Sequence, residues 1–276
     1  MIQAPPQRPN PGNFNFRDKA LSVALIGAGG NGSEMLDGLM RIHQGMIALD
    51  APGLQVHVFD DDVVEASNIV RQRFWPHEIG MNKATALVNS VNMLMGAGWR
   101  DYPRRVEPQD LNDIIPKVDL VITAVDNVAL RQALALVAAN RPTEPTFTAG
   151  PRANSRHRTM WCDLGCSGDK GQMVMGALDG SSLDDPLPNV IAHFPAMLEA
   201  EDTDTEPSCG AAQSLARQDL MINQQVSASA INLLWKMLRT GYMPYNGTII
   251  DLACGLTQAI EFAHQTDDTE TESENG

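Results

Sequence analysis

Short apolar runs alternate with longer amphipathic segments along the first half of the chain, which is the rhythm of an α/β protein. Three runs rich in β-branched residues are typical of strands buried on both faces of a parallel sheet: "LSVALIG" (21–27), "LQVHVFD" (54–60) and "VDLVITAVD" (118–126). Three segments after these runs space their apolar residues by three and four, as amphipathic helices do: 31–42, 80–98 and 127–140. We therefore expect a Rossmann-like parallel sheet flanked by helices.

The pattern changes after residue 150. Residues 158–178 contain two apolar runs around a Gly-rich turn, which favours an antiparallel pair of strands. A long irregular stretch follows from 181 to 210. Residues 218–241 predict a long helix that stops at a glycine, and residues 247–256 predict a last strand. The parallel sheet should therefore be extended by an antiparallel C-terminal part.

Composition and charge narrow the class of protein. A chain of 276 residues with 43% apolar content can bury a full core in one large domain. The formal charge of −14 argues against nucleic acid as a partner. No apolar run reaches the roughly 18 residues of a membrane span, and the N-terminus lacks the features of a signal peptide. We expect no membrane association and a cytoplasmic location.

The segment "GAGGNG" (27–32) lies between the first predicted strand and the first predicted helix. Gly27, Gly29 and Gly32 have the G-x-G-x-x-G spacing, and Gly30 lies within it. Glycines let the backbone turn tightly and approach a phosphate, while the helix start offers free N–H groups to an anion. A tight turn without a ligand is the alternative, and the loop alone leaves both NAD and ATP open.

Asp60 ends the second predicted strand, where a Rossmann-type acid accepts hydrogen bonds from ribose hydroxyls. The residues that separate ATP from NAD come after it. Asn68, Arg71 and Gln72 place two amides and a planar cation within five residues, a set suited to triphosphate oxygens. Lys83 adds a mobile point charge at the start of the second helix.

Two of the arginines in this segment also have a structural interpretation, as partners in surface ion pairs. For Arg71 alone, a surface salt bridge to Asp61 or Asp62 is the alternative. Arg73 is interpreted as a solvated or ion-paired side chain.

Four motifs in order resemble the adenylating domain of the ThiF/MoeB/HesA superfamily, relatives of ubiquitin-activating enzymes. They are "GAGGNG", "DDDVVEASNIVRQ", "GMNKA" and "DNVALR", within residues 21–131. The later region, with its Gly-Gln-containing hairpin and "QDLMINQQVSASAINLLWKML", is similar to the ThiF family protein of the PRTRC system. The resemblance implies ATP-dependent adenylation of the C-terminal carboxylate of a ubiquitin-like or sulfur-carrier protein.

The resemblance also assigns roles to residues. It implies that Asp60 holds the ribose, that Asp126 holds Mg²⁺, and that four polar residues after Asp60 hold the phosphates. The implied nucleotide-binding set is Gly27, Gly29, Gly30, Gly32, Asp60, Asp62, Asn68, Arg71, Gln72 and Lys83. The implied catalytic set is Asp126, Arg71, Lys83 and Cys209.

Asp126 also stands out from the residues themselves. It ends a predicted buried strand beside the glycine loop, where a carboxylate can coordinate Mg²⁺ that keeps most of its waters. Its alternative is an N-cap for the helix that begins at Asn127, and the two roles can coexist. Arg131 matches the arginine of the family motif, with a structural ion pair as the equal alternative.

The four cysteines (Cys162, Cys166, Cys209 and Cys254) are irregularly spaced, so we expect reduced thiols. Many relatives carry two Cys-x-x-Cys pairs that bind zinc; this sequence has none, so we expect no structural zinc. Cys209 lies at the end of the long acidic loop, where family members often place a cysteine that accepts the acyl group as a thioester. A small buried or capping residue is the alternative.

The predicted domain limits follow from the same resemblance. A single ThiF-type adenylating domain should span 17–264, with a nucleotide-binding half (17–150) and a carrier-protein-binding half (151–264). Residues 1–16 form a flexible lead, and 265–276 form a disordered acidic tail. A homodimer is expected because the last helix carries more apolar surface than one face requires: Leu233, Leu234, Trp235 and Leu238.

Two other functions remain open at this stage. An NAD-dependent dehydrogenase would use the same glycine loop, although it has no need for "SNIVRQ" after the second strand. A catalytically inactive nucleotide-binding scaffold would keep the loop and lose the chemistry. The retained Asp126 speaks against that scaffold.

Overall fold

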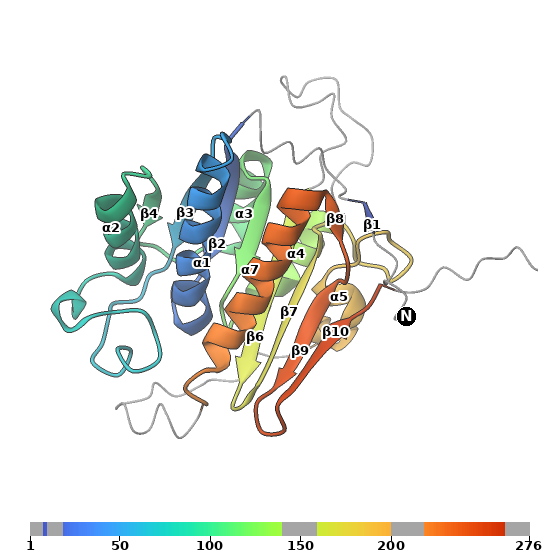
Figure 1. Ribbon diagram of the computed structural model, residues 1–276. Coiled ribbons are helices and arrows are strands. Elements are labelled where there is room, and N and C mark those ends of the chain that lie inside the picture. Colours follow the sequence, from blue (N-terminus) through green and yellow to red (C-terminus); the bar gives the residue numbers. More distant parts are fainter. Residues whose placement is uncertain (1–7, 10–18, 140–158, 200–217, 263–276) are drawn as a thin grey trace, which may run out of the picture.

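The computed structural model describes residues 8–9, 19–139, 159–199 and 218–262. An eight-stranded sheet in the order β10-β9-β7-β6-β5-β2-β3-β4 forms its centre (Figure 1). The strands are β2 (Leu21–Ile26), β3 (Leu54–Phe59), β4 (Arg100–Tyr102), β5 (Leu120–Thr123), β6 (Met160–Ser167), β7 (Lys170–Ala177), β9 (Gly247–Asp251) and β10 (Leu256–Ile260). Strands β4, β3, β2, β5 and β6 are parallel, and β7, β9 and β10 continue the sheet antiparallel. The predicted fold class is confirmed.

Helices cover both faces of the sheet. One face carries α1 (Gly30–Ile47), α2 (Lys83–Met95) and α7 (Ile222–Thr240), whose buried residues join one apolar cluster. The other carries α3 (Leu111–Ile114), α4 (Val128–Ala139) and α5 (Val190–His193), which contribute to a second cluster. Among the described helices, none is long and apolar enough to cross a membrane.

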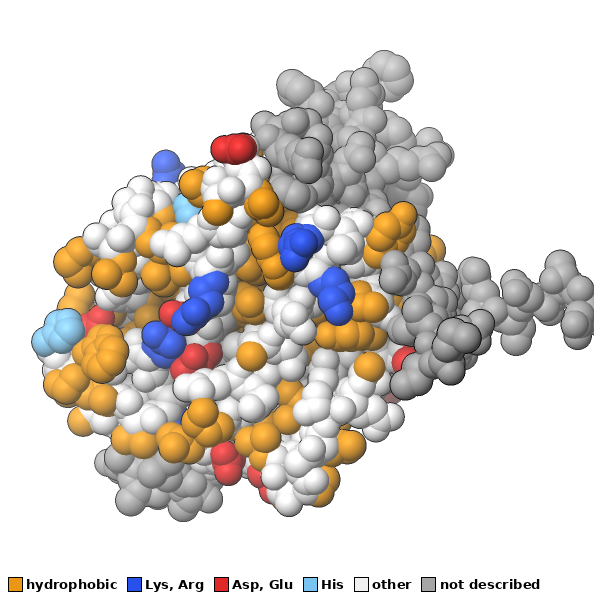
Figure 2. All heavy atoms as spheres, in the orientation of Figure 1, with side chains coloured by type: hydrophobic (Ala, Val, Ile, Leu, Met, Phe, Trp, Pro, Cys, Tyr) orange, Lys and Arg blue, Asp and Glu red, His pale blue; other side chains and the backbone are white. Residues whose placement is uncertain are grey.

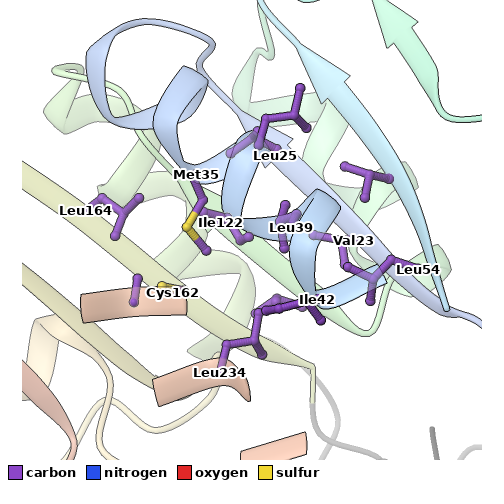
Figure 3. Packing of buried hydrophobic residues seen from close by; sticks show 14 of the residues in the cluster. Val23, Leu25, Met35, Leu39, Ile42, Leu54, Ile122, Cys162, Leu164 and Leu234 are labelled. Carbon is purple, nitrogen blue, oxygen red and sulfur yellow. The ribbon is translucent and has the colours of Figure 1, made fainter. Parts of the chain in front are cut away.

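The core between α1, α7 and the sheet is built from side chains of distant segments. In Figure 3, Leu39 and Ile42 of α1, Leu234 of α7 and Cys162 of β6 lie around one apolar space. All four are at most 3% exposed, so this layer is dry and closely packed. Helix α7 is thereby fixed over the junction of the parallel and antiparallel strands.

Most of the apolar residues of α7 that suggested a dimer are buried in this core. Leu233, Leu234 and Leu238 are at most 3% exposed, and only Trp235 of that set is half-buried. The interpretation of these residues as excess apolar surface was wrong. Helix α7 lies between α1 and the antiparallel strands, so both of its flanks are apolar for internal reasons.

The element boundaries differ from the prediction in two places. The predicted strand 247–256 is the first strand and turn of a hairpin, because Gly255 has φ +68° and the chain returns as β10. The last helix begins at Ile222 and not at 218, since Gln218 forms an isolated bridge with Gly168. A two-residue pairing of β1 (Arg8–Pro9) with β8 (Tyr242–Met243) completes the described strands.

Candidate functional site

The glycine turn after β2 needs glycine at two positions. Gly27 has φ +94°, and a Cβ atom there would lie 2.5 Å from the carbonyl oxygen of Ala124. A Cβ atom on Gly32 would collide with the carbonyl oxygen of Gly27. The turn therefore brings the start of α1 directly against the ends of β2 and β5, as a G-x-G-x-x-G segment does when it serves an anion.

The first turn of α1 is open on its outer side. The N-cap residue Gly29 makes no side-chain capping bond, and a Cβ atom at Gly29 would meet nothing within 4 Å. The first N–H groups of a helix have no partner within the helix, and they carry the positive end of the helix dipole. Gly29 and Gly30 are only half-buried, so the N–H groups of this turn can serve a ligand at the carboxyl edge of the sheet.

Asp60 holds the glycine turn from the next strand. Its Oδ2 accepts a hydrogen bond from Ala28 N at 2.6 Å, and its Oδ1 accepts one from Asp62 N at 2.8 Å. Burial raises the pKa of this carboxyl above its ordinary value, while the Ala28 hydrogen bond and the charge of Lys83 oppose the rise. Asp60 therefore lies where the sequence placed it, at the end of β3 and beside the first helix.

The segment that carries Arg71 and Gln72 is pinned to α1. The backbone N–H of Arg73 donates to Ser33 Oγ at 3.1 Å, and Asn68 closes the preceding turn by accepting from Glu65 N at 2.9 Å. Gln72 Oε1 is buried without a hydrogen-bond partner among the described residues. An unpartnered buried acceptor beside an uncapped helix start is a feature expected of a ligand site.

Arg71 does not form the predicted alternative pair, because Asp62 pairs with Lys83 and Arg71 Nη1 donates to Gln218 Oε1. Burial lowers the pKa of Arg71, and the nearby Cys166 and Asp126 raise it. These electrostatic partners place Arg71 between β6 and the segment after β5. Arg71 and Asp126 are thus close enough to interact electrostatically.

Lys83 is held more tightly than expected. Its side chain is only 9% exposed, and its Nζ lies 2.7 Å from Asp62 Oδ2, whose side chain is 66% exposed. Asn82 caps α2 by accepting from Thr85 N and also donates to the backbone oxygens of Asp60 and Asp62. Lys83 is therefore paired with Asp62 beside the turn after β3 in this structure, where the sequence suggested an unpaired charge.

Asp126 follows β5 and is exposed. Its alternative role as an N-cap is wrong, because Asn127 Oδ1 accepts the hydrogen bond from Leu130 N at 3.1 Å. The carboxylate of Asp126 is therefore not used to begin α4. An exposed carboxylate at the carboxyl edge of the sheet suits Mg²⁺, which binds one or two carboxylates and keeps several waters.

Arg131 lies in a buried network under the same edge. Its Nε lies 2.7 Å from Asp163 Oδ1, and its Nη2 donates to the carbonyl oxygen of Leu164 at 3.0 Å. Thr123 Oγ1 donates to the same Asp163 oxygen at 2.5 Å and accepts from Trp161 Nε1 at 2.8 Å. The structural ion pair is thus the alternative that the structure favours for Arg131.

Sequence analysis missed a cluster of polar side chains around Cys166. Gln218 Nε2 donates to Cys166 Sγ at 2.6 Å, and the thiol donates to Asn223 Oδ1 at 3.2 Å. Asn31 Nδ2 lies 3.4 Å from the same sulfur. Burial raises the pKa of the Cys166 thiol, with hydrogen bonds from Asn31 and Gln218 opposing. No periodicity joins these residues, because they come from α1, β6 and the entry to α7.

Two further features lie near the motif residues. A cavity of about 500 Å³ opens between α1 and α7, on the face shown in Figure 2, and it contains the ion pair of Arg73 with Asp37 at 3.2 Å. Asp60, Asp61 and Asp62 bring carboxylate oxygens within 4.8 Å of one another. Backbone N–H groups and Lys83 already occupy the oxygens of Asp60 and Asp62.

Cys209 lies outside the described residues, as do the predicted lead 1–16 with the exception of residues 8–9, and the predicted tail 265–276. The role of Cys209 as the thioester cysteine therefore stays a prediction.

Comparison with known proteins identifies the family. A model of the ThiF family matches residues 17–266. The chain belongs to the ThiF family. Over 130 residues it is 29% identical to ubiquitin-like modifier-activating enzyme 5 of Xenopus laevis, a match that covers 42% of this chain and 30% of that protein. Over 116 residues it is 32% identical to adenylyltransferase and sulfurtransferase UBA4 of Debaryomyces hansenii, covering 41% and 24%. The ThiF chain thus matches less than a third of the length of each of these two relatives.

Solved structures show the same fold. The crystal structure of E. coli MccB with ATP matches with a TM-score of 0.54 and 14% identity, over 90% of this chain and 65% of that one. PaaA matches with a TM-score of 0.57 and 16% identity, over 88% and 64%. At these identities the likeness concerns the ThiF fold alone.

Proposed function

We propose that this ThiF-family protein binds ATP and adenylates the C-terminal carboxylate of a ubiquitin-like or sulfur-carrier protein. One observation carries the proposal: Arg71, on the segment that Ser33 pins to α1, interacts electrostatically with Asp126 at the carboxyl edge of the sheet. Family membership and the similarity to an activating enzyme over 130 residues support the same activity.

The adenosine end of ATP would lie over β3. Asp60 is the residue that we assign to the ribose, at the end of that strand and next to the glycine turn. The phosphates would lie on the N–H groups at the start of α1, within reach of Arg71 and Lys83. Asn68 and Gln72 would add neutral donors, and Asp62 would release Lys83 to the phosphates.

Asp126 would hold Mg²⁺, whose charge would neutralise the phosphate oxygens. The carboxylate of the carrier protein arrives already ionised, so the site needs no general base. Its oxygen attacks the α-phosphorus, the bond to the β-phosphate oxygen breaks, and pyrophosphate leaves. The contribution of the protein is to hold the reactants in line and to neutralise charge, for which Arg71 and Lys83 are suited.

The test is ATP–pyrophosphate exchange with a candidate carrier protein ending in Gly-Gly. Asp126→Asn keeps the shape of the side chain and should reduce exchange by about 100-fold or more, with ATP binding largely kept. Asp61→Asn removes a neighbouring exposed acid and should leave exchange unchanged. Tight ATP binding without exchange for any carrier would favour the inactive scaffold, and tight NADH binding would favour the dehydrogenase.

A thioester on Cys209 is a separate proposal. If it forms, Cys209→Ala should keep ATP–pyrophosphate exchange, because adenylation comes first, and should lose any reductant-sensitive adduct with the carrier. An adduct that persists in Cys209→Ala would contradict the proposal.

The homodimer, the cytoplasmic location, the PRTRC relationship and the division into nucleotide-binding and carrier-protein-binding halves stay predictions. Helix α7 no longer supports the dimer, since Leu233, Leu234 and Leu238 are buried within the chain. Sedimentation velocity of the purified protein would test it directly. Genome neighbours that encode a protein ending in Gly-Gly would test the PRTRC relationship and name the carrier.

A further inference from the structure

Cys166 lies at the end of a row of inward-facing side chains on β6. Cys162 and Leu164, on the same side of the strand, are fully buried in the core (Figure 3). Cys166 is half-buried, because β6 here reaches the carboxyl edge of the parallel strands. The same row therefore ends with a thiol beside the start of α1 and not in the core.

Polar groups from three elements surround this thiol. Asn31 belongs to the first turn of α1, Gln218 precedes α7, and Asn223 lies in the first turn of α7. Gln218 also accepts a hydrogen bond from Arg71, the cation that we assign to the phosphates. The side chain of Gln218 thus links the sulfur of Cys166 to Arg71. Among the described residues, Asp126 and Arg71 are the charged groups within electrostatic range of Cys166.

A second observation marks this place as a binding site. Asn223 is 2% exposed, and its Nδ2 has no hydrogen-bond partner among the described residues. The same amide lies against Gly30, because a Cβ atom on Gly30 would be 2.5 Å from Asn223 Nδ2. A buried donor without a partner is costly, and it lies here between the thiol and the helix start.

We propose that Cys166 is a modification site, at which a small anionic disulfide such as oxidised glutathione forms a mixed disulfide that blocks nucleotide binding. This inference rests on the proposed ATP site. The sulfur of Cys166, once deprotonated, attacks one sulfur of the disulfide; a new S–S bond forms, the old one breaks, and reduced glutathione leaves and takes up the proton. The carboxylates of the attached peptide would lie beside Arg71, in the space that the phosphates need.

The chain supplies its own controls. Cys162 is fully buried, and burial raises the pKa of its thiol further, so it should not react. Cys254 is exposed at the β9–β10 turn and should react without any effect on ATP. Because burial also raises the pKa of Cys166, its reaction should keep accelerating as pH rises through and beyond the ordinary thiol range.

The experiment uses the full chain in a Cys209→Ser background. The ATP affinity of the reduced protein is measured first, since failure there concerns the proposed function and not this site. After treatment with oxidised glutathione at pH 8.5, peptide mass spectrometry should find the adduct on Cys166. ATP affinity should fall more than about tenfold and return with dithiothreitol, and bound ATP should slow the modification.

Two results would overturn the proposal. One is a Cys166 adduct that leaves ATP affinity unchanged, and the other is failure of Cys166 to react while Cys254 does. Cys166→Ser, or Cys166→Ala if serine does not fold, should keep its ATP affinity under the same treatment. Equal loss of affinity in these variants would also contradict the proposal.

Discussion

Two ion pairs at the carboxyl edge of the sheet have the same N–O distance of 2.7 Å and opposite surroundings. In the pair of Lys83 with Asp62, the acid is 66% exposed, whereas in the pair of Arg131 with Asp163 the acid is 1% exposed. Water can solvate Asp62 if Lys83 turns to a phosphate. Asp163 has no such option. Since the two cations are almost equally buried, at 9% and 8% exposed, the burial of the acid separates a cation that can serve a ligand from one that holds the fold.

The largest expected effect comes from breaking the buried pair. Arg131→Met leaves the carboxylate of Asp163 buried without its cation and should lower the free energy of unfolding by about 3–5 kcal/mol, measured by urea unfolding at pH 7. Replacing both partners, with Arg131→Met and Asp163→Leu together, should recover part of the loss. If Arg131→Met lowers the free energy of unfolding by less than about 1 kcal/mol, burial of Asp163 does not give this pair its structural role.

The pair of Lys83 with Asp62, in which only the acid is exposed, should respond in the opposite way. Lys83→Met should change the free energy of unfolding by no more than about 1 kcal/mol, because Asp62 can be hydrated, yet it should weaken ATP binding more than about tenfold. Isothermal titration calorimetry measures the binding. Lys170→Met, which removes a lysine from an exposed pair with Asp251 at the far part of the sheet, should leave ATP binding unchanged. Unchanged binding in Lys83→Met would remove this lysine from the site.

The smallest expected effect is a pH dependence at Asp60. Its pKa is raised in the folded protein, so the protonated form favours folding, and that contribution is lost as pH rises through the folded pKa. Asp60→Asn cannot titrate. As pH falls from 7 through the folded pKa toward 3.8, wild type should gain stability relative to the variant in dilute urea titrations. A difference in stability between wild type and Asp60→Asn that stays constant, or that changes in the opposite direction, would contradict the raised pKa of Asp60.

The parallel half of the fold could be predicted because each strand and helix there has its own periodicity. The strands at 21–27 and 54–60 appear within one residue of the predicted ends, and the helices after them were expected from apolar spacing. The strand predicted at 118–126 is shorter, Leu120–Thr123, because the chain leaves the sheet before Asp126. The hairpin β9–β10 was missed because its turn lies within an apolar stretch.

The motif residues of the site could be named, but their partners could not. Gln218 and Cys166 are 147 and 95 positions away from Arg71 in sequence, so no local pattern relates them. The pairing of Lys83 with Asp62, next to the helix cap at Asn82, became visible only with the fold. Likewise, apolar residues of α7 look like surplus surface until the sheet and α1 are both in place.

Strand β10 ends the sheet on one side, and four of its five residues are exposed. An edge strand presents unpaired backbone groups to any further strand. Since β10, β9, β7, β6 and β5 would separate an added strand from β2, that strand would lie about 29 Å from the glycine turn at the usual strand spacing. This edge is therefore a place where an engineered hairpin or fused module could lengthen the protein without touching its chemistry.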